Sequence, residues 1–112
     1  MLPRKNLISL KKEFPRLRQQ GKIYNSDSFS LIVSYGSSSL PQAAFVVSKK
    51  VSTKSVIRHA AKRKLADAVA PYLIHLPRKT QLVFLAKQKA IDVSQKDLQK
   101  ETEGILKRTK LL

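Results

Sequence analysis

The sequence has no cysteine, no tryptophan and only three glycines. Without cysteine the chain has no disulfide, no thiolate nucleophile and no cysteine-based zinc site. The three glycines stand far apart, so the chain also lacks a glycine-rich loop that cradles phosphates. No apolar run is long enough to span a bilayer, and the basic N-terminus lacks the apolar segment of a signal peptide. We therefore expect a cytoplasmic protein with no membrane partner.

Acidic residues are scarce: seven Asp and Glu stand against 23 Lys and Arg, which gives a net charge of +16. Such self-repulsion destabilises a compact chain, and binding of a polyanion is the usual compensation. Apolar residues make up 42% of the 112 residues, which is enough for one modest core. The composition therefore predicts a single domain, residues 1–112, that binds nucleic acid.

Catalytic and metal-binding patterns are also missing from the sequence. The seven carboxylates are scattered and form no paired metal motif. His59 and His75 lie sixteen residues apart, and His59 has no carboxylate beside it. For each histidine the sequence favours a structural or solvent-facing role over acid–base catalysis. We expect no metal or cofactor bound by a motif of the protein, and no independent nuclease site.

The first half of the chain contains patterns typical of one helix and two strands. Residues 1–8 are expected to be a loose basic arm, and residues 10–20 a helix that ends before a glycine. Alternating apolar residues predict a strand within residues 22–35. The turn cluster at residues 36–41 and the apolar residues 43–48 then predict a second strand that returns as a hairpin.

The second half is predicted to form helix, strand and helix. A helix with a core-facing stripe is expected over about residues 55–70, where Pro71 limits it. Residues 81–86 are almost continuously apolar, as in a strand covered on both faces, and Ser94 begins a last helix. The stripe consists of Ile57, Ala61, Leu65, Ala68 and Tyr72. This order of elements predicts one α+β sheet with helices packed on it.

The most informative segment is a β-branched run that stops at two lysines and is followed by a basic helix. Lys54, Arg58 and Lys62 recur at i, i+4 and i+8, and His59 and Arg63 repeat this spacing one position over. Like charges at this spacing repel, so together with the charge of the whole chain they favour an anionic partner over a merely solvated face. The expected RNA-binding residues are Lys49, Lys50, Lys54, Arg58, His59, Lys62 and Arg63.

Two segments carry a resemblance to a known family. Residues 45–51, Phe-Val-Val-Ser-Lys-Lys-Val, are similar to an apolar family strand that ends in Ser-Lys-Lys. Residues 58–63, Arg-His-Ala-Ala-Lys-Arg, are similar to a helix motif written Arg-Asn-Arg-x-Lys-Arg, with His59 and Ala60 as the two departures. On these motifs the chain resembles the protein subunit of bacterial ribonuclease P.

The resemblance implies a compact α-β-β-β-α-β-α sandwich with a central mixed sheet and a left-handed βαβ crossover, an exception to the usual hand. It also implies that a partner RNA, joined by one protein, cuts precursor tRNA at the mature 5′ end using bound Mg²⁺. The protein would bind this catalytic RNA through the basic helix and hold the 5′ leader in a groove between the sheet and the first helix. The family's groove positions fall on Phe14, Arg18, Phe29 and Ile32.

Two questions stay open at the level of sequence. Phe14 and Phe29 either offer ring faces on which unpaired bases stack, or pack in the core. RNA binding suits the subunit of a ribonucleoprotein endonuclease, and it equally suits a structural RNA-binding protein of ribosomal type. A basic nuclease that works without an RNA partner is the third alternative.

Overall fold

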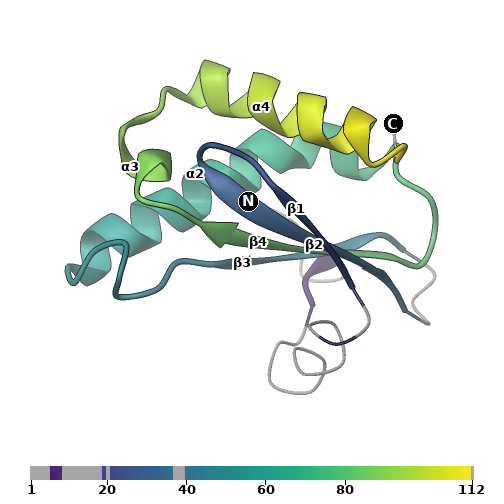
Figure 1. Cartoon of the computed structure of the whole chain (residues 1–112), viewed down its shortest axis with the longest axis horizontal. Helices are drawn as coiled ribbons and strands as arrows, with labels where there is room; N and C mark the ends of the chain where they lie inside the picture. Colours follow the sequence, from purple (N-terminus) through teal and green to yellow (C-terminus); the bar gives the residue numbers. More distant parts are fainter. Residues whose placement is uncertain (1–5, 9–18, 20, 37–39, 112) are drawn as a thin grey trace.

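The computed structural model describes residues 6–8, 19, 21–36 and 40–111 of the chain. Its elements are β1 (Lys22–Asn25), β2 (Phe29–Tyr35), β3 (Gln42–Val46), α2 (Ser55–Leu73), β4 (Thr80–Ala86), α3 (Lys89–Asp92) and α4 (Gln95–Arg108) (Figure 1). The helix expected over residues 10–20, which includes Phe14 and Arg18, falls almost wholly outside the described residues. None of the described helices is long and apolar enough to cross a membrane.

The strand expected over residues 22–35 is in fact two strands, β1 and β2, joined by a tight turn. The chain reverses at Ser26, whose amide donates to the carbonyl of Phe29 at 2.9 Å. Asn25, Ser26 and Asp27 favour a turn because their side chains hydrogen-bond to nearby backbone groups and compete with the strand. The two strands then pair antiparallel, with Ile23 opposite Ile32.

The β1–β2 turn is fastened to α4 by a carboxylate. Glu101 accepts hydrogen bonds from the Ser28 amide at 3.0 Å and from the Ser28 hydroxyl at 3.1 Å. Ser28 is fully buried, so an unpaired amide there has no water to replace the lost partner. We expect Glu101→Ala to lower the free energy of unfolding by about 1–3 kcal/mol, measured by urea denaturation. The neighbouring exposed Lys100→Ala is the control, and equal losses for the two variants would contradict the fastening role.

The sheet order is β1-β2-β4-β3, so the hairpin expected between residues 22–35 and 43–48 does not form. β4 lies between β2 and β3, antiparallel to the first and parallel to the second. A strand that is apolar on both faces suits the centre of a sheet, where both of its edges are also hydrogen-bonded. α2 is the crossover between the parallel neighbours β3 and β4, as in the expected βαβ unit. Its expected left hand stays a prediction.

Residues 6–8 are not part of a loose arm, because they run along the outer edge of β3. Leu7 forms an isolated parallel bridge with Ala43, and the Ile8 amide donates to the Ala43 carbonyl at 3.2 Å. The Asn6 side chain donates to the Pro41 carbonyl at 2.9 Å. An edge strand leaves backbone groups unpaired, and this segment supplies some of them with partners.

The helices largely begin and end where the sequence places them. The three central residues of the predicted α2 stripe are buried, and the two at its ends are half-buried. α2 continues past Pro71 to Leu73, which is buried in the core below it. Ser94 caps α4 as predicted, and its hydroxyl accepts from the Asp97 amide at 3.1 Å. The short helix α3 is an element that the sequence did not predict.

The core has two parts, one on each face of the sheet. The larger part fills the space between the sheet and the helices α2 and α4, which cover the same face (Figure 1). There Phe84 meets Phe29 edge to face, with 5.2 Å between ring centroids, and stacks on Phe45 at 5.4 Å. The smaller part lies on the opposite face and consists of Ile8, Ile32, Ala44 and Val83. β4 contributes to both parts, which confirms the prediction of a strand covered on both faces.

Candidate RNA-binding surface

A short turn between β3 and α2 carries the first group of predicted RNA-binding residues. The turn is closed by the Val51 amide, which donates to the Ser48 carbonyl at 3.1 Å, and Val51 itself is buried. Lys49 and Lys50 lie in this turn and are exposed, and Lys54 is exposed at the N-cap of α2. The buried valine therefore anchors a turn that holds two lysines close to the third, Lys54, at the start of the helix.

The start of α2 attracts anions for a second reason. Its first turn, residues 55–58, lies within the described part of the chain and contains no acidic residue. The free amides at the N-terminus of a helix carry a partial positive charge, and no carboxylate offsets that charge here. Lys54 and Arg58 add full charges at the same point. The backbone and the side chains thus favour phosphate at this end of α2.

Arg58 is the best-positioned cation of the surface. Its Nη1 donates to the carbonyl of Ser52 at 3.0 Å, and the side chain is half-buried. A guanidinium has five N–H donors, so one bond to the backbone orients the group and leaves most of its donors for a ligand. Arg58 is therefore held in place before any phosphate binds, which lowers the entropic cost of a bidentate contact.

A groove of about 370 Å³ runs between the end of β3 and the first half of α2. We call it the basic groove; its lining residues are Phe45, Val46, Val47, Ser55, Arg58, His59 and Lys62. The helix supplies the polar and charged residues of this lining, and β3 with the residue after it supplies the apolar ones. The cationic side of this groove suits the phosphates of a sugar–phosphate chain.

The predicted basic face is divided between two sides of α2. Arg58, His59 and Lys62 line the basic groove, whereas Arg63 lines a separate hollow together with Ala60, Lys64, Asp67 and Gln95. Each residue of an α-helix is rotated by about 100° from the one before it. Two adjacent rows of residues therefore point in different directions, one toward each side of the helix. The structure therefore brings three of the five helical residues into one groove and sets Arg63 apart from them.

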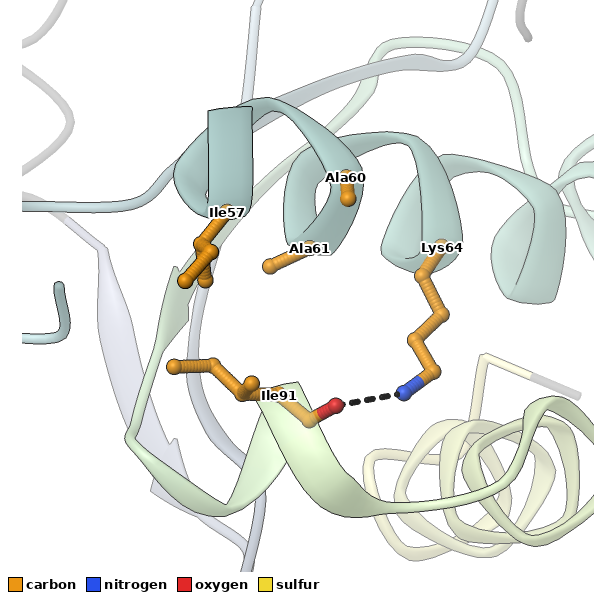
Figure 2. Close-up of a pocket in the computed structure, with 5 residues that line it drawn as sticks. All are labelled: Ile57, Ala60, Ala61, Lys64 and Ile91. Carbon is orange, nitrogen blue, oxygen red and sulfur yellow. Dashed lines mark hydrogen bonds between the residues drawn. The ribbon is translucent and has the colours of Figure 1, made fainter. Parts of the chain in front are cut away.

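Ala60, the departure from the family motif, is exposed and borders two hollows. The larger hollow measures about 390 Å³ and is lined by Ile57, Ala60, Ala61, Lys64 and Ile91 (Figure 2). Figure 2 shows Lys64 reaching across it to α3, where its Nζ donates to the carbonyls of Ala90 and Ile91 at 3.1 Å each. Lys64 thus binds α3 to α2.

The two described residues of the expected leader groove lie on opposite faces of the sheet. Phe29 is fully buried on the face covered by α2 and α4, and its ring packs against Phe84. Ile32 is 2% exposed and belongs to the core on the other face. Residues an odd number apart on a strand point to opposite faces, so these two cannot line one groove. The structure places Phe29 in the core, which corrects its assignment to the leader groove; Phe14 and Arg18 lie outside the described residues.

The two histidines lie at opposite ends of α2. His59 lines the basic groove, and His75 is exposed in the turn that follows the helix. In the described part of the chain, no group of three or more His, Asp or Glu side chains is arranged to hold a metal ion. The basic groove beside His59 offers the cations Arg58 and Lys62 to an anion.

Comparisons with known sequences point to one family. A family model described as Ribonuclease P matches residues 2–110 of the chain. A protein of Clostridium novyi named ribonuclease P protein component is 30% identical over 101 residues, which cover 88% of each chain. A protein of the same name from Pseudanabaena is 28% identical over 113 residues, which cover 100% of this chain and 97% of that protein.

Solved structures of two RNase P proteins share the fold. A Staphylococcus aureus RNase P protein, a mutant with defective mRNA degradation activity, superposes with a TM-score of 0.84 at 21% identity over 96% of this chain and 90% of that one. The Thermotoga maritima RNase P protein gives a TM-score of 0.79 at 18% identity over 90% of this chain and 94% of that one. These likenesses confirm the predicted α+β fold. Since the family model covers nearly the whole chain, this protein belongs to the ribonuclease P protein family.

Proposed function

We propose that the chain is the RNA-binding protein subunit of ribonuclease P and takes part in tRNA processing as part of this endoribonuclease. The observation that carries the proposal is the basic groove, in which an oriented arginine, a lysine and the amino end of α2 meet. Phosphates of the catalytic RNA would bind Arg58 and Lys62, and sugars would pack against Val46 and Val47. Lys49, Lys50 and Lys54 extend the cationic track beyond the groove.

In this proposal the RNA carries out the cleavage and the protein positions it. Mg²⁺ prefers oxygen ligands, whereas Arg58, His59 and Lys62 offer cationic or nitrogen groups and Ser55 a single hydroxyl. The residues of the basic groove therefore do not fit a magnesium ion, and we assign the ions to the RNA. One protein per RNA and a cytoplasmic location are parts of the same proposal.

The 5′ leader of precursor tRNA would lie on the face of the sheet opposite α2 and α4. Ile32, Ala44 and Val83 on this face are buried, so the leader would contact the half-buried Leu85 beside them. Phe14 and Arg18 stay predicted partners of the leader. Ile32 is aliphatic and buried, so it offers the leader no ring face for stacking. We therefore propose that this leader groove depends more on charge than on stacking.

Reconstitution tests the proposed function directly. The protein is added to a cognate catalytic RNA at low Mg²⁺, and cleavage of precursor tRNA is followed with time. We expect a clear stimulation over RNA alone, because bound cations reduce the repulsion between RNA and substrate. Tight RNA binding without stimulation would favour the structural protein of ribosomal type. Cleavage by the protein alone, lost in His59→Ala, would favour the independent nuclease.

Restoring the family residue at position 60 should strengthen RNA binding. Ala60 is exposed and borders two hollows, so an arginine there has room and reaches solvent. We expect Ala60→Arg to tighten binding of the catalytic RNA by about 1 kcal/mol, since a charge-assisted contact is added. Filter binding measures the affinity, and thermal unfolding with and without RNA checks the fold. Ala60→Gln, which adds length without charge, is the control. A lower melting temperature with no gain in affinity would contradict this expectation.

A further inference from the structure

A second groove lies at the end of the molecule away from the basic groove. It measures about 220 Å³ and is lined by Lys22, Tyr24, Val33, Ser34, Tyr35 and Thr109. The lining comes from β1, β2 and the C-cap of α4, so we call it the α4-end groove. Figure 1 shows the end of α4 and the loop from α2 to β4 at the opposite end of α2 from the β3–α2 turn. A helix of 19 residues separates these ends by roughly 28 Å.

One lysine lines this groove, and two more are sequence neighbours of residues that line it or pair with its lining. Lys22 lines it, and Lys110 follows the lining residue Thr109. Lys79 precedes Thr80, which pairs with the lining residue Tyr35. The carbonyl of Lys79 accepts a hydrogen bond from the Gly36 amide at 2.8 Å. All three lysines are exposed, and none of the six described residues that line the groove is acidic. The α4-end groove therefore attracts anions.

Lys107, one turn back on α4, already has a partner. Its Nζ lies 3.1 Å from a Glu103 carboxylate oxygen, and the Tyr72 hydroxyl donates to the same carboxylate at 3.3 Å. The hydrogen bond and the charge of Lys107, followed by the bond from Tyr72, hold the pKa of Glu103 below its usual value. The charge of Lys107 is thus largely offset by Glu103, so we assign only Lys22, Lys79 and Lys110 to the groove as cations.

The backbone at two of these lysines favours glycine. Lys79 has φ of 68° and Lys110 has φ of 64°, and they are the only two non-glycine residues with positive φ in the described part of the chain. Lys79 is the third residue of a turn closed by the Thr80 amide on the Pro77 carbonyl at 3.4 Å, a position where glycine is usual. Lys110 follows the C-cap of α4, where the Leu111 amide bonds to the Leu106 carbonyl at 3.1 Å, and glycine is usual there too.

Lysine at both sites therefore costs backbone stability that glycine would not. The two strained lysines lie in turns next to the segments that form the groove, and they share positive charge with Lys22. Strained backbone conformations are held by the surrounding structure and cluster at ligand-binding sites. The task that the groove indicates is binding of an anion.

We infer that the α4-end groove binds a single-stranded RNA segment, with its phosphates on Lys22, Lys79 and Lys110 and a base against Tyr35. Tyr35 is 61% exposed, and unpaired bases stack on exposed aromatic rings. The inference rests on the proposed RNA-binding function, and it adds an RNA-binding surface separate from the basic groove.

The test uses glycine substitutions that remove charge while they suit the backbone. The double variant Lys79→Gly and Lys110→Gly is made in two backgrounds of the whole chain. One is the parent sequence, and the other carries Arg58→Ala, Lys62→Ala and Arg63→Ala. Binding of a fluorescein-labelled oligouridylate is measured by anisotropy over a range of salt concentrations. We expect the melting temperature to stay or rise, and the log–log salt slope to flatten by roughly 1.4 units, about 0.7 for each phosphate of a single strand that is no longer neutralised. If the basic groove does not bind RNA, the Arg58, Lys62 and Arg63 substitutions leave the salt slope unchanged. If the α4-end groove does not bind RNA, the two glycine substitutions leave the slope unchanged in both backgrounds.

Two controls and one ring variant complete the test. Lys96→Ala with Lys100→Ala removes two exposed charges of α4 elsewhere and should leave the slope unchanged. Tyr35→Ala should weaken binding roughly tenfold, whereas Tyr35→Phe, which keeps the ring, should bind like the parent. An unchanged slope in the glycine variant would overturn the inference, as would an equal change in the Lys96 and Lys100 control. Competition by polyglutamate as strong as by oligouridylate would also overturn it, because the groove would then bind acidic chains rather than RNA.

Discussion

Replacing Arg58, Lys62 and Arg63 together by alanine should flatten the log–log salt dependence of RNA binding by roughly two to three units, about 0.9 for each duplex phosphate that the protein no longer neutralises. Each neutralised phosphate releases counterions, so the slope reports the number of ionic interactions, which affinity alone does not. Filter binding to the catalytic RNA at several salt concentrations gives the slope. An unchanged slope would remove the first half of α2 from the interface.

The basic residues of α2 lie on two sides of the helix, so smaller variants can test each side separately. Arg58 and Lys62 line the basic groove, and Arg63 lies in a different hollow beside Asp67. The double variant Arg58→Ala and Lys62→Ala should therefore account for about two of the units, and Arg63→Ala for at most one. Lys96→Ala with Lys100→Ala, two exposed lysines of α4, serves as the matched control. A larger effect from Arg63 than from the pair would show that the RNA approaches from the α3 side.

Stability should change little in these variants. Lys62 and Arg63 are exposed, and exposed charges contribute little to folding. Arg58 donates to the Ser52 carbonyl, so its loss should cost about 0.5–1.5 kcal/mol of unfolding free energy. Circular dichroism under thermal unfolding checks this before any binding is measured. The salt slope then reports on the interface rather than on a partly unfolded protein.

Phe29→Ala should destabilise the fold by about 3–5 kcal/mol, because a fully buried ring is replaced by a cavity. The ring also meets Phe84 edge to face, with 5.2 Å between centroids and 87° between planes, and such pairs add about 0.5–1.5 kcal/mol beyond their buried area. Urea denaturation measures the loss. Phe29→Leu, which keeps most of the apolar volume, should lose much less.

The same position tests whether the core or the leader groove needs this ring. Phe29→Leu stays folded in this expectation, so its holoenzyme can be compared on precursor and mature tRNA. We expect Phe29→Leu to change the affinity for precursor and mature tRNA by the same factor, since Phe29 faces α2 and α4. A loss of affinity for the precursor alone would show that the ring of Phe29 contacts the leader. Leu85→Ala, at a half-buried residue on the opposite face of the sheet, is the comparison, and there a loss specific to the precursor is expected.

Features that depend on neighbours in the chain were predictable from the sequence. The stripe of α2, the Ser94 cap of α4 and the basic residues around the start of α2 all follow from spacings within a few turns. Helical interactions at i and i+4, and caps at i and i+3, are local, so the sequence alone specifies them. The continuous apolar run of β4 likewise indicated burial on both faces before its partners were known.

Features that depend on distant segments were decided by the tertiary structure. The family resemblance put Phe29 and Ile32 in one groove, although residues three apart on a strand point to opposite faces, and only the structure shows which face the helices cover. Sequence order suggested that residues 22–35 and 43–48 pair, whereas β4, which follows them in the chain, lies between them. Strand partners are chosen by the burial of the whole sheet, and no local spacing encodes that choice.

The α4-end groove shows most clearly the difference between what local sequence predicts and what tertiary structure decides. The sequence shows Lys22, Lys79 and Lys110 as three unrelated lysines, and no spacing connects them. Only the pairing of β2 with β4 and the packing of α4 bring the segments that carry them to the same groove. The positive φ of Lys79 and Lys110 is likewise set by how their turns close against the rest of the molecule. The sequence by itself determined the charge, the helices α2 and α4 and the basic segment of this protein. Which cations share a surface was decided by interactions between residues far apart in the chain, because only the folded backbone fixes their distances.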